Sequence, residues 1–283
     1  MIPAGFDYAR PKSLDEAFEL LAKHGADAKL LAGGHSLIPM MKLRLATPSM
    51  LIDISRIPDL NNIAVSGDGL AIGALTSHAA IASSADVRRI APALQEAASG
   101  IGDAQVRNRG TIGGSCAHAD PSADYPAVML ALEATFTVRS RGGEETIPAA
   151  DLFRGMFETA LADDAVLTGI GIGAAPHSAY VKYPHPASHF AVVGVAAKIE
   201  LKGSTIAAAR VAVTGVGDRA FRATAVEKAL TGVDSHDAEA IRSACVDAAS
   251  GVEARSDVFA SGAYRSAMAD VFAVRAITAA VNR

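Results

Sequence analysis

Cysteine and tryptophan are the scarcest residues of this 283-residue chain, which contains two cysteines and no tryptophan. Cys116 and Cys245 are too few for a disulfide framework, and by themselves they cannot hold an iron–sulfur cluster. No apolar run approaches the roughly 18 residues that a membrane span needs. The first dozen residues lack the apolar core of a secretory signal. We therefore expect a cytoplasmic protein without a membrane span.

An excess of charge of one sign is also lacking. The chain has 26 Lys and Arg against 30 Asp and Glu, a formal net charge of −4. Arginine pairs such as Arg88-Arg89 are scattered instead of forming a patch, so no nucleic-acid partner is expected. Half of the residues are hydrophobic and only 20% are charged, which is enough apolar surface for a folded core. The length predicts about two domains.

Local patterns near the N-terminus predict alternating strands and helices. Ser13 and Glu16 form a capping box that begins a helix, and Gly25 ends it. Apolar runs at 29–32 and 51–54 predict strands. A second helix between them would carry Met40, Met41 and Leu45. This β-α-β-α-β order is typical of a small parallel sheet.

Later segments follow the same logic. Residues 63–75 alternate around "SGDG" and predict a hairpin, and helices are expected at 77–83 and 92–99. Residues 190–201 and 205–213 predict antiparallel strands, followed by helices. The last of these helices would carry four residues on one face: Ala267, Val271, Val274 and Thr278.

Two Gly-Gly pairs stand directly after apolar residues and before small polar ones. Gly33-Gly34 lies in "KLLAGGHSLIPMM", and Gly113-Gly114 lies in "GTIGGSCAHAD". We expect both turns to point backbone N–H groups and hydroxyls at one anion, of which a pyrophosphate is the natural example. Neither turn is a phosphate-binding P-loop, because the "GxxxxGK[ST]" spacing is absent. A third pair, Gly142-Gly143, lies among charged residues and predicts a solvated hairpin turn.

One further glycine stretch imitates a nucleotide-binding motif. "GIGIGA", residues 169–174, formally matches the dinucleotide fingerprint GxGxxG/A, which requires a helix to begin there. Ala175 and Pro176 follow instead, without helical periodicity. We predict a loop that ends a domain.

A cluster of possible metal ligands follows the second glycine pair: Cys116, His118, Asp120 and Asp124. Such donors make a metal-dependent hydrolase conceivable. The chain has no HExxH or CxxC motif, and these donors straddle a glycine turn and a proline without a regular scaffold. No metal site is therefore predicted.

The two glycine motifs together resemble those of a known family. "LLAGGHSLIPMMKLRLA", followed later by "RNRGTIGGSCAHADPSAD", is similar to the FAD-binding medium subunit of the molybdenum hydroxylases, the family of carbon monoxide dehydrogenase and xanthine dehydrogenase. The likeness extends over the whole chain, through "YVKYPHPASHFAVVGVAA" to "AYRSAM".

The resemblance implies an α+β fold. Residues 1–176 would form a two-lobed FAD-binding domain of the vanillyl-alcohol-oxidase (PCMH) type, with lobes at about 1–57 and 58–176. Residues 177–283 would form an α+β C-terminal domain with a small antiparallel sheet and helices.

The resemblance also implies how FAD is held. The first glycine turn would wrap the pyrophosphate, and the second would close on it together with His118. Asp124 would meet the adenosine ribose, and Leu167 and Lys182 would lie near the flavin ring. Phe190 would stack on that ring, although a core position on a strand is an equal interpretation. The implied cofactor-binding residues are Leu30, Leu31, Ala32, Gly33, Gly34, His35, Ser36, Leu37, Ile101, Thr111, Gly113, Gly114, Ser115, His118, Asp124, Leu167, Lys182 and Phe190.

The function implied by the resemblance is electron transfer. A large molybdopterin subunit would hydroxylate the substrate, a small subunit with iron–sulfur clusters would relay the electrons, and this chain would pass them from FAD to an external acceptor. The assembly would be a dimer of heterotrimers. A self-contained FAD-dependent oxidase is the alternative, but no second substrate pocket or catalytic dyad can be named in the sequence.

Overall fold

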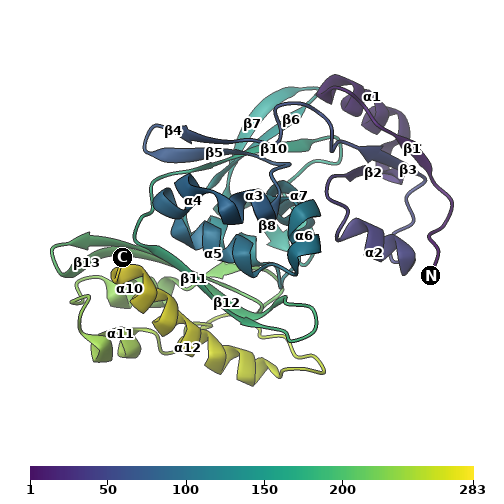
Figure 1. The fold of residues 1–283 in the computed structure, drawn as a ribbon. Helices are drawn as coiled ribbons and strands as arrows, with labels where there is room; N and C mark the ends of the chain where they lie inside the picture. The colour runs from purple at the N-terminus through teal and green to yellow at the C-terminus, as the bar shows by residue number, and fades with distance from the viewer.

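The computed structural model describes residues 1–283 as two lobes and a C-terminal sheet with helices (Figure 1). The first lobe contains a three-stranded sheet in the order β1-β3-β2, with all pairs parallel. Its elements are β1 (Asp7–Ala9), α1 (Leu14–His24), η1 (Gly25–Asp27), β2 (Ala28–Leu31), α2 (Leu37–Lys42) and β3 (Met50–Asp53). The predicted small parallel sheet is confirmed.

Local sequence signals explain the start of this lobe. The Ser13 hydroxyl accepts the Glu16 backbone N–H at 3.2 Å and begins α1. The Glu16 carboxylate accepts the backbone N–H of Lys12 at 2.7 Å. In the predicted capping box it would accept the N–H of Ser13, so the observed contact lies one residue earlier in the chain. Helix α2 ends at Lys42, and Leu45 lies beyond it with 72% of its surface exposed.

The second lobe is built on a five-stranded sheet in the order β4-β5-β10-β6-β7. Its strands are β4 (Ile63–Ser66), β5 (Gly69–Gly73), β6 (Thr135–Ser140), β7 (Gly143–Pro148) and β10 (Val166–Ile172), and a separate pair is formed by β8 (Phe153–Gly155) and β9 (Glu158–Thr159). Its helices are α3 (His78–Ser83), α4 (Ala85–Ile90), α5 (Pro92–Gly100), α6 (Ala104–Arg109), α7 (Ile112–His118), α8 (Asp124–Ala131) and α9 (Ala149–Leu152). The predicted hairpin and the helices α3 and α5 are confirmed, whereas the six-residue helices α4 and α6 were not predicted.

The prediction of a loop at "GIGIGA" is wrong. Residues 169–172 of this stretch belong to β10, which pairs with β5 on one side and with β6 on the other, and Gly173 and Ala174 follow the strand. Ile170 and Ile172 are buried and alternate with Gly169 and Gly171, so the period is that of a strand. Because no helix follows, the rejection of a Rossmann fingerprint stands.

The second glycine pair also differs from the prediction. Gly113 and Gly114 lie inside the first turn of α7, not in a turn that precedes a helix. A Cβ on Gly113 would lie 2.5 Å from the Cβ of Ala74, so this glycine allows α7 to pack closely against the end of β5. Gly113 therefore serves helix packing.

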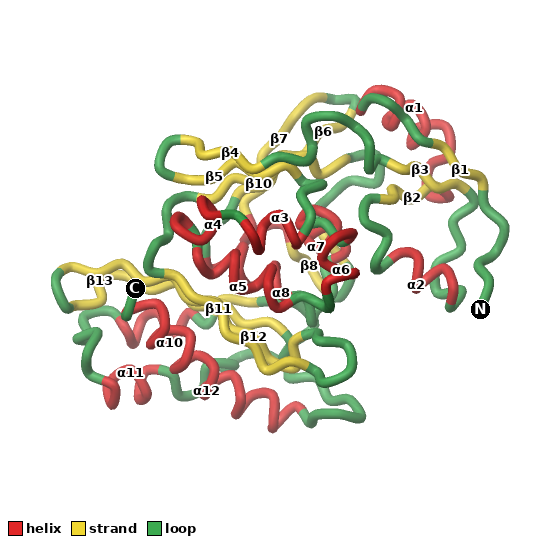
Figure 2. Tube along the Cα trace, in the orientation of Figure 1, coloured by secondary structure: helices red, strands yellow, loops and turns green.

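The C-terminal part contains a four-stranded antiparallel sheet in the order β11-β12-β13-β14. Its elements are β11 (Ser178–Pro184), β12 (Ala191–Lys202), β13 (Thr205–Thr214), β14 (Phe221–Arg222), α10 (Thr224–Leu230), α11 (Ala238–Ala244) and α12 (Gly262–Val281). One face of the sheet packs on α5 and α8 of the second lobe, and the other face packs on α10 and α12 (Figure 2). The predicted antiparallel strands and α+β fold are confirmed.

The last helix presents a different face to the core than the sequence suggested. Ala267, Val271 and Thr278 do share a face of α12, but they are exposed to solvent. The buried face is Ala269, Phe272, Ala273, Ala276, Ile277 and Ala280. Its alanines let the helix lie close to β12, because close packing against a sheet requires small side chains. No helix combines the length and apolarity needed to cross a membrane.

Candidate cofactor site

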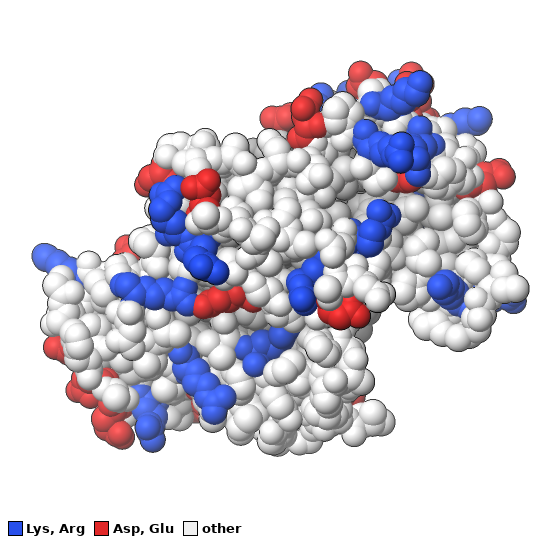
Figure 3. All heavy atoms as spheres, viewed as in Figure 1, with Lys and Arg blue, Asp and Glu red and all other residues white.

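A cavity of about 690 Å³ lies where the two lobes meet the loop before β12. The space-filling view shows a notch between the part of the first lobe that carries α2 and the rest of the molecule (Figure 3). Every residue of the implied cofactor-binding set lines this cavity except Lys182. Residues far apart in the sequence are thus brought to one concave site of the size that small-molecule ligands occupy.

The first glycine turn offers free hydrogen-bond donors to the cavity. The backbone N–H groups of Gly33, Gly34, His35 and Ser36 donate to no acceptor in the chain. The segment is a loop between β2 and α2 (Figure 2), and Gly34 has a φ of +76°, which favours glycine. Consecutive free N–H groups form a concave anion-binding arrangement. Four consecutive N–H donors match the several acceptor oxygens of a pyrophosphate.

Gly33 is required by the fold itself. A Cβ at this position would lie 2.2 Å from the backbone oxygen of Arg109, at the start of the chain's path from α6 to α7. The next residue, Gly110, packs on the ring of His78, whose Nδ1 lies 3.1 Å from the Tyr125 hydroxyl. Burial lowers the pKa of His78 to about 4, so its imidazole is neutral at pH 7. The backbone of Gly33 in the first lobe thus packs directly on the backbone of Arg109 and Gly110 in the second lobe.

The second motif does not offer a second run of N–H groups, contrary to the prediction. The Ile112 N–H donates to the Thr76 carbonyl at 3.0 Å, and the Gly113 N–H donates to the Ala74 carbonyl at 2.8 Å. The Gly114 N–H donates to Oγ1 of Thr111 at 3.1 Å, which caps α7. The hydrogen-bonding group that this motif leaves free is the Ser115 hydroxyl, which lines the cavity.

Asp124 is the buried charged group of the cavity wall. It begins α8, and only 4% of its surface is exposed. Its Oδ1 accepts the Tyr180 hydroxyl at 2.5 Å and lies 2.9 Å from Nζ of Lys182, both on β11. Burial raises the pKa of Asp124, against the opposing effects of Lys182 and Tyr180. Because Oδ2 accepts no hydrogen bond from another residue, it remains available to a ligand.

Lys182 lies behind Asp124 instead of in the cavity wall. Its Nζ donates to the carbonyl oxygens of Gly100 and His189, both at 2.8 Å, in addition to the ion pair. The ion pair shows that the two side chains lie side by side. The separate roles implied by the resemblance, ribose for Asp124 and flavin ring for Lys182, stay predictions.

Aromatic and imidazole rings are among the groups that line the cavity. The His118 ring lies 5.0 Å from that of Phe157, and burial lowers the pKa of His118. Phe190 is 43% exposed and precedes β12, so its interpretation as a core residue is wrong. Its neighbour His189 has a φ of +62°.

Some lining residues carried no signal in the sequence. Phe157, with a φ of +56°, lines the cavity together with Glu158 and Asp163. Phe157 lies in the short connection between β8 and β9, and its backbone N–H donates to the Ala119 carbonyl at 3.1 Å. No motif predicts that contact, because it joins segments through tertiary packing alone.

The possible metal ligands do not converge. No group of three or more His, Cys, Asp or Glu residues could hold a metal ion. Cys116 is completely buried in the core, where burial raises the pKa of its thiol. It therefore faces away from the cavity that His118 and Asp124 line.

Comparisons with known proteins agree with this geometry. A family described as "FAD binding domain in molybdopterin dehydrogenase" matches residues 4–174, and "CO dehydrogenase flavoprotein C-terminal domain" matches residues 178–280. The carbon monoxide dehydrogenase medium chain of Hydrogenophaga pseudoflava is 41% identical over 286 residues, covering 100% of this chain and 99% of that one. The glyceraldehyde dehydrogenase medium chain of Sulfolobus acidocaldarius is 37% identical, covering 98% of each.

Solved structures extend the agreement to three dimensions. A carbon monoxide dehydrogenase structure from Hydrogenophaga pseudoflava matches with a TM-score of 0.94 and 44% identity, covering 99% of this chain and 98% of that chain. The family resemblance identified from the two glycine motifs is thereby confirmed. This chain belongs to the FAD-binding medium subunits of the molybdopterin dehydrogenases, of the carbon monoxide dehydrogenase and xanthine dehydrogenase type.

Proposed function

We propose that this chain holds FAD in the cavity between its lobes and passes electrons from a partner's iron–sulfur clusters to an external acceptor. The small iron–sulfur subunit and a large molybdopterin subunit would complete a dimer of heterotrimers. The names of the relatives support the assembly, since a medium chain implies further chains. FAD, when bound, supplies the redox chemistry, and the protein supplies binding and orientation.

The observation that carries the proposal is the run of free N–H groups from Gly33 to Ser36. Four consecutive donors without acceptors in the chain require a ligand or water to satisfy them. A doubly charged pyrophosphate satisfies several at once, and charge-assisted hydrogen bonds are stronger than neutral ones. The Ser115 hydroxyl faces the same cavity from α7.

The remaining wall residues fit the rest of a dinucleotide. Oδ2 of Asp124 can accept a hydrogen bond from a ribose hydroxyl or from a flavin N–H. Leu167 and Ile101 offer apolar surface to a flat ring, and Phe190 offers a partly exposed aromatic face. If FAD binds there, these side chains would help to exclude water from its flavin ring.

The purified chain, expressed without partners, tests the proposal. We expect a yellow protein that releases FAD on denaturation, and that accepts electrons from a chemical reductant and returns them to an artificial acceptor. Anaerobic mixing with aldehydes, purines and other N-heterocycles should leave the flavin absorbance unchanged. Addition of the iron–sulfur and molybdopterin subunits should then make the flavin bleach with the substrate of the complex.

Two outcomes would contradict the proposal in different ways. Bleaching by any of these substrates without partners would show that the chain has its own substrate site, as in a self-contained oxidase. A colourless protein with stoichiometric zinc would favour a metal-dependent hydrolase.

A further inference from the structure

We propose that Tyr180, a residue of the C-terminal sheet, is a positioning residue of the cofactor site: its hydroxyl holds Oδ1 of Asp124 so that Oδ2 faces the cavity. The inference rests on the proposed function, because it assigns Oδ2 to the bound FAD. Tyr180 itself does not line the cavity and would act only through Asp124.

The geometry divides the two oxygens of the carboxylate between the protein and the cavity. Both protein donors, the Tyr180 hydroxyl at 2.5 Å and the Lys182 Nζ at 2.9 Å, lie on Oδ1 of Asp124. A phenol donates one directional hydrogen bond, whereas an ammonium group can rotate its three donors. Tyr180 is therefore the contact that determines which carboxylate oxygen points inward.

Tyr180 is itself held rigidly. Only 6% of its surface is exposed, and its backbone N–H donates to the Glu96 carboxylate at 2.8 Å. On the adjacent strand β12, a Cβ at Gly194 would lie 2.2 Å from the Tyr180 hydroxyl, so a glycine makes room for it. A side chain with a fixed ring and one donor is suited to orient a carboxylate.

Lys182 alone cannot orient the Asp124 carboxylate in place of Tyr180. Its Nζ is shared among Asp124 and the carbonyl oxygens of Gly100 and His189. Without the tyrosine hydroxyl, the carboxylate is free to turn about its χ2 torsion and to present both oxygens to Nζ. Oδ2 would then be withdrawn from the cavity.

The same part of the chain also holds the backbone before Asp124. The Thr214 hydroxyl donates to the carbonyl oxygens of Pro121 and Ala123, at 3.0 and 2.8 Å. The Ser122 carbonyl accepts the N–H of Ala191 at 3.1 Å. Backbone and carboxylate of this cavity residue are thus both positioned by the C-terminal sheet.

The test compares Tyr180→Phe with Tyr183→Phe in the full chain. Tyr183 lies on the same strand, but its ring stacks on Phe272 at 6.2 Å and is not in contact with Asp124. We measure the FAD dissociation constant of the apoprotein by quenching of flavin fluorescence. Y180F should bind FAD about tenfold more weakly than wild type, the loss expected for a misplaced hydrogen bond to a charged group. Y183F should bind as wild type does.

A double-mutant cycle separates positioning from packing. In an Asp124→Ala background, or Asp124→Ser if the first variant does not fold, adding Y180F should change FAD affinity by less than twofold, because Tyr180 acts through the carboxylate. An equal loss from Y180F with and without Asp124 would overturn the inference, as would wild-type affinity of Y180F. If wild type and Y183F themselves bind no FAD, the proposed function fails instead.

Discussion

At the scale of single residues, the two glycine pairs are alike in sequence and different in what they do. At Gly33 the Arg109 backbone approaches too closely for any side chain, and the N–H groups of this turn donate to no acceptor in the chain. Gly113 and Gly114 lie in a helix whose first N–H groups already have acceptors. Only the first pair is therefore suited to hold an anion through its backbone.

Replacing Gly33 with valine should abolish FAD binding. The new Cβ would overlap the Arg109 carbonyl oxygen at 2.2 Å, which would push the lobes apart and cost about 1–3 kcal/mol of stability or more. The ratio of flavin to protein absorbance after purification measures the effect. Gly173→Val is the matched control, because nothing lies within 4 Å of a Cβ there. G33V protein that purifies with a full complement of FAD would refute the turn assignment.

Gly114→Val should lose FAD for another reason. Its Cβ would lie 2.7 Å from Oγ1 of Thr111, the side chain that caps α7. Loss of such a cap costs about 1 kcal/mol and would displace Ser115 in the cavity wall. The same absorbance ratio, together with an unchanged far-ultraviolet spectrum, measures this effect. Retention of both FAD and wild-type stability would contradict it.

At the scale of elements, one polar cluster joins β1 to β3 at the edge of the first lobe. The Asp53 carboxylate accepts hydrogen bonds from the Tyr8 hydroxyl, from Nε of Arg10 and from the Ser55 N–H. Burial opposes ionisation, but hydrogen bonding by the Ser55 hydroxyl, and after it by the Tyr8 hydroxyl, the Ser55 N–H and Arg10, lowers the pKa of Asp53 to about 2. The ionised form is therefore favoured in the folded protein.

This lowered pKa predicts a pH-dependent contribution to stability. Because the folded value lies below the ordinary value of 3.8, the contribution is complete above pH 3.8 and disappears as the pH falls through about 2. Asp53→Asn should lower the free energy of unfolding by about 1 kcal/mol at pH 7, allowing for solvent screening. Denaturant titrations of both proteins between pH 2 and 7 measure the difference. A difference in the free energy of unfolding that is as large at pH 2 as at pH 7 would contradict the assignment.

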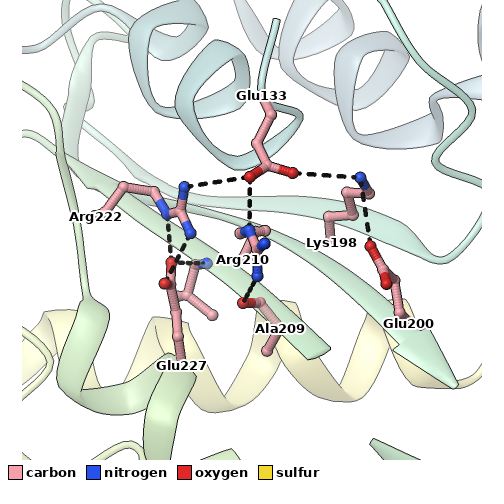
Figure 4. Close-up of polar contacts among 8 residues, drawn as sticks. Glu133, Lys198, Glu200, Ala209, Arg210, Arg222 and Glu227 are labelled. Carbon is pink, nitrogen blue, oxygen red and sulfur yellow. Dashed lines mark hydrogen bonds and ion pairs between the residues drawn. The ribbon is translucent and has the colours of Figure 1, made fainter. Parts of the chain in front are cut away.

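At the scale of the whole molecule, two kinds of contact join the second lobe to the C-terminal sheet. Glu133, just after α8, pairs with Arg210 at 2.7 Å and with Lys198 at 3.6 Å (Figure 4). These ions are partly exposed, with 44% of the Glu133 side chain accessible. Thr214 is completely buried and bonds two carbonyl oxygens of the segment before α8. Exposed ion pairs contribute little to stability, whereas buried groups left without partners cost more.

Thr214→Val should therefore destabilise the protein more than Glu133→Gln. We expect about 1–3 kcal/mol for T214V and less than about 1 kcal/mol for E133Q. Urea denaturation at low and high salt distinguishes the two, because salt screens only the exposed ions. A larger effect for E133Q, or a T214V effect that disappears in salt, would show that the ion pairs dominate the contact between the domains.

The sequence alone determined most of the local structure and the residues of the cavity wall. The Ser13 cap, the apolar strands and the 63–75 hairpin are encoded by neighbours in the chain, so periodicity and capping residues suffice to predict them. The two glycine motifs identified the family, and the segments they mark do line one cavity. Phe157 was missed, because its position depends on distant packing and not on a local pattern.

Only the tertiary structure decided which of these groups are available to a ligand. The N–H groups of Ile112 and Gly113 are occupied by carbonyls of the Ala74–Thr76 segment, while those of the first turn have no acceptor. "GIGIGA" became a central strand because β5 and β6 lie on either side of it. Asp124 keeps one free oxygen because β11, remote in sequence, brings two donors to the other. Hydrogen-bond partners and burial are set by which segments meet in space, and a local sequence pattern does not contain that information.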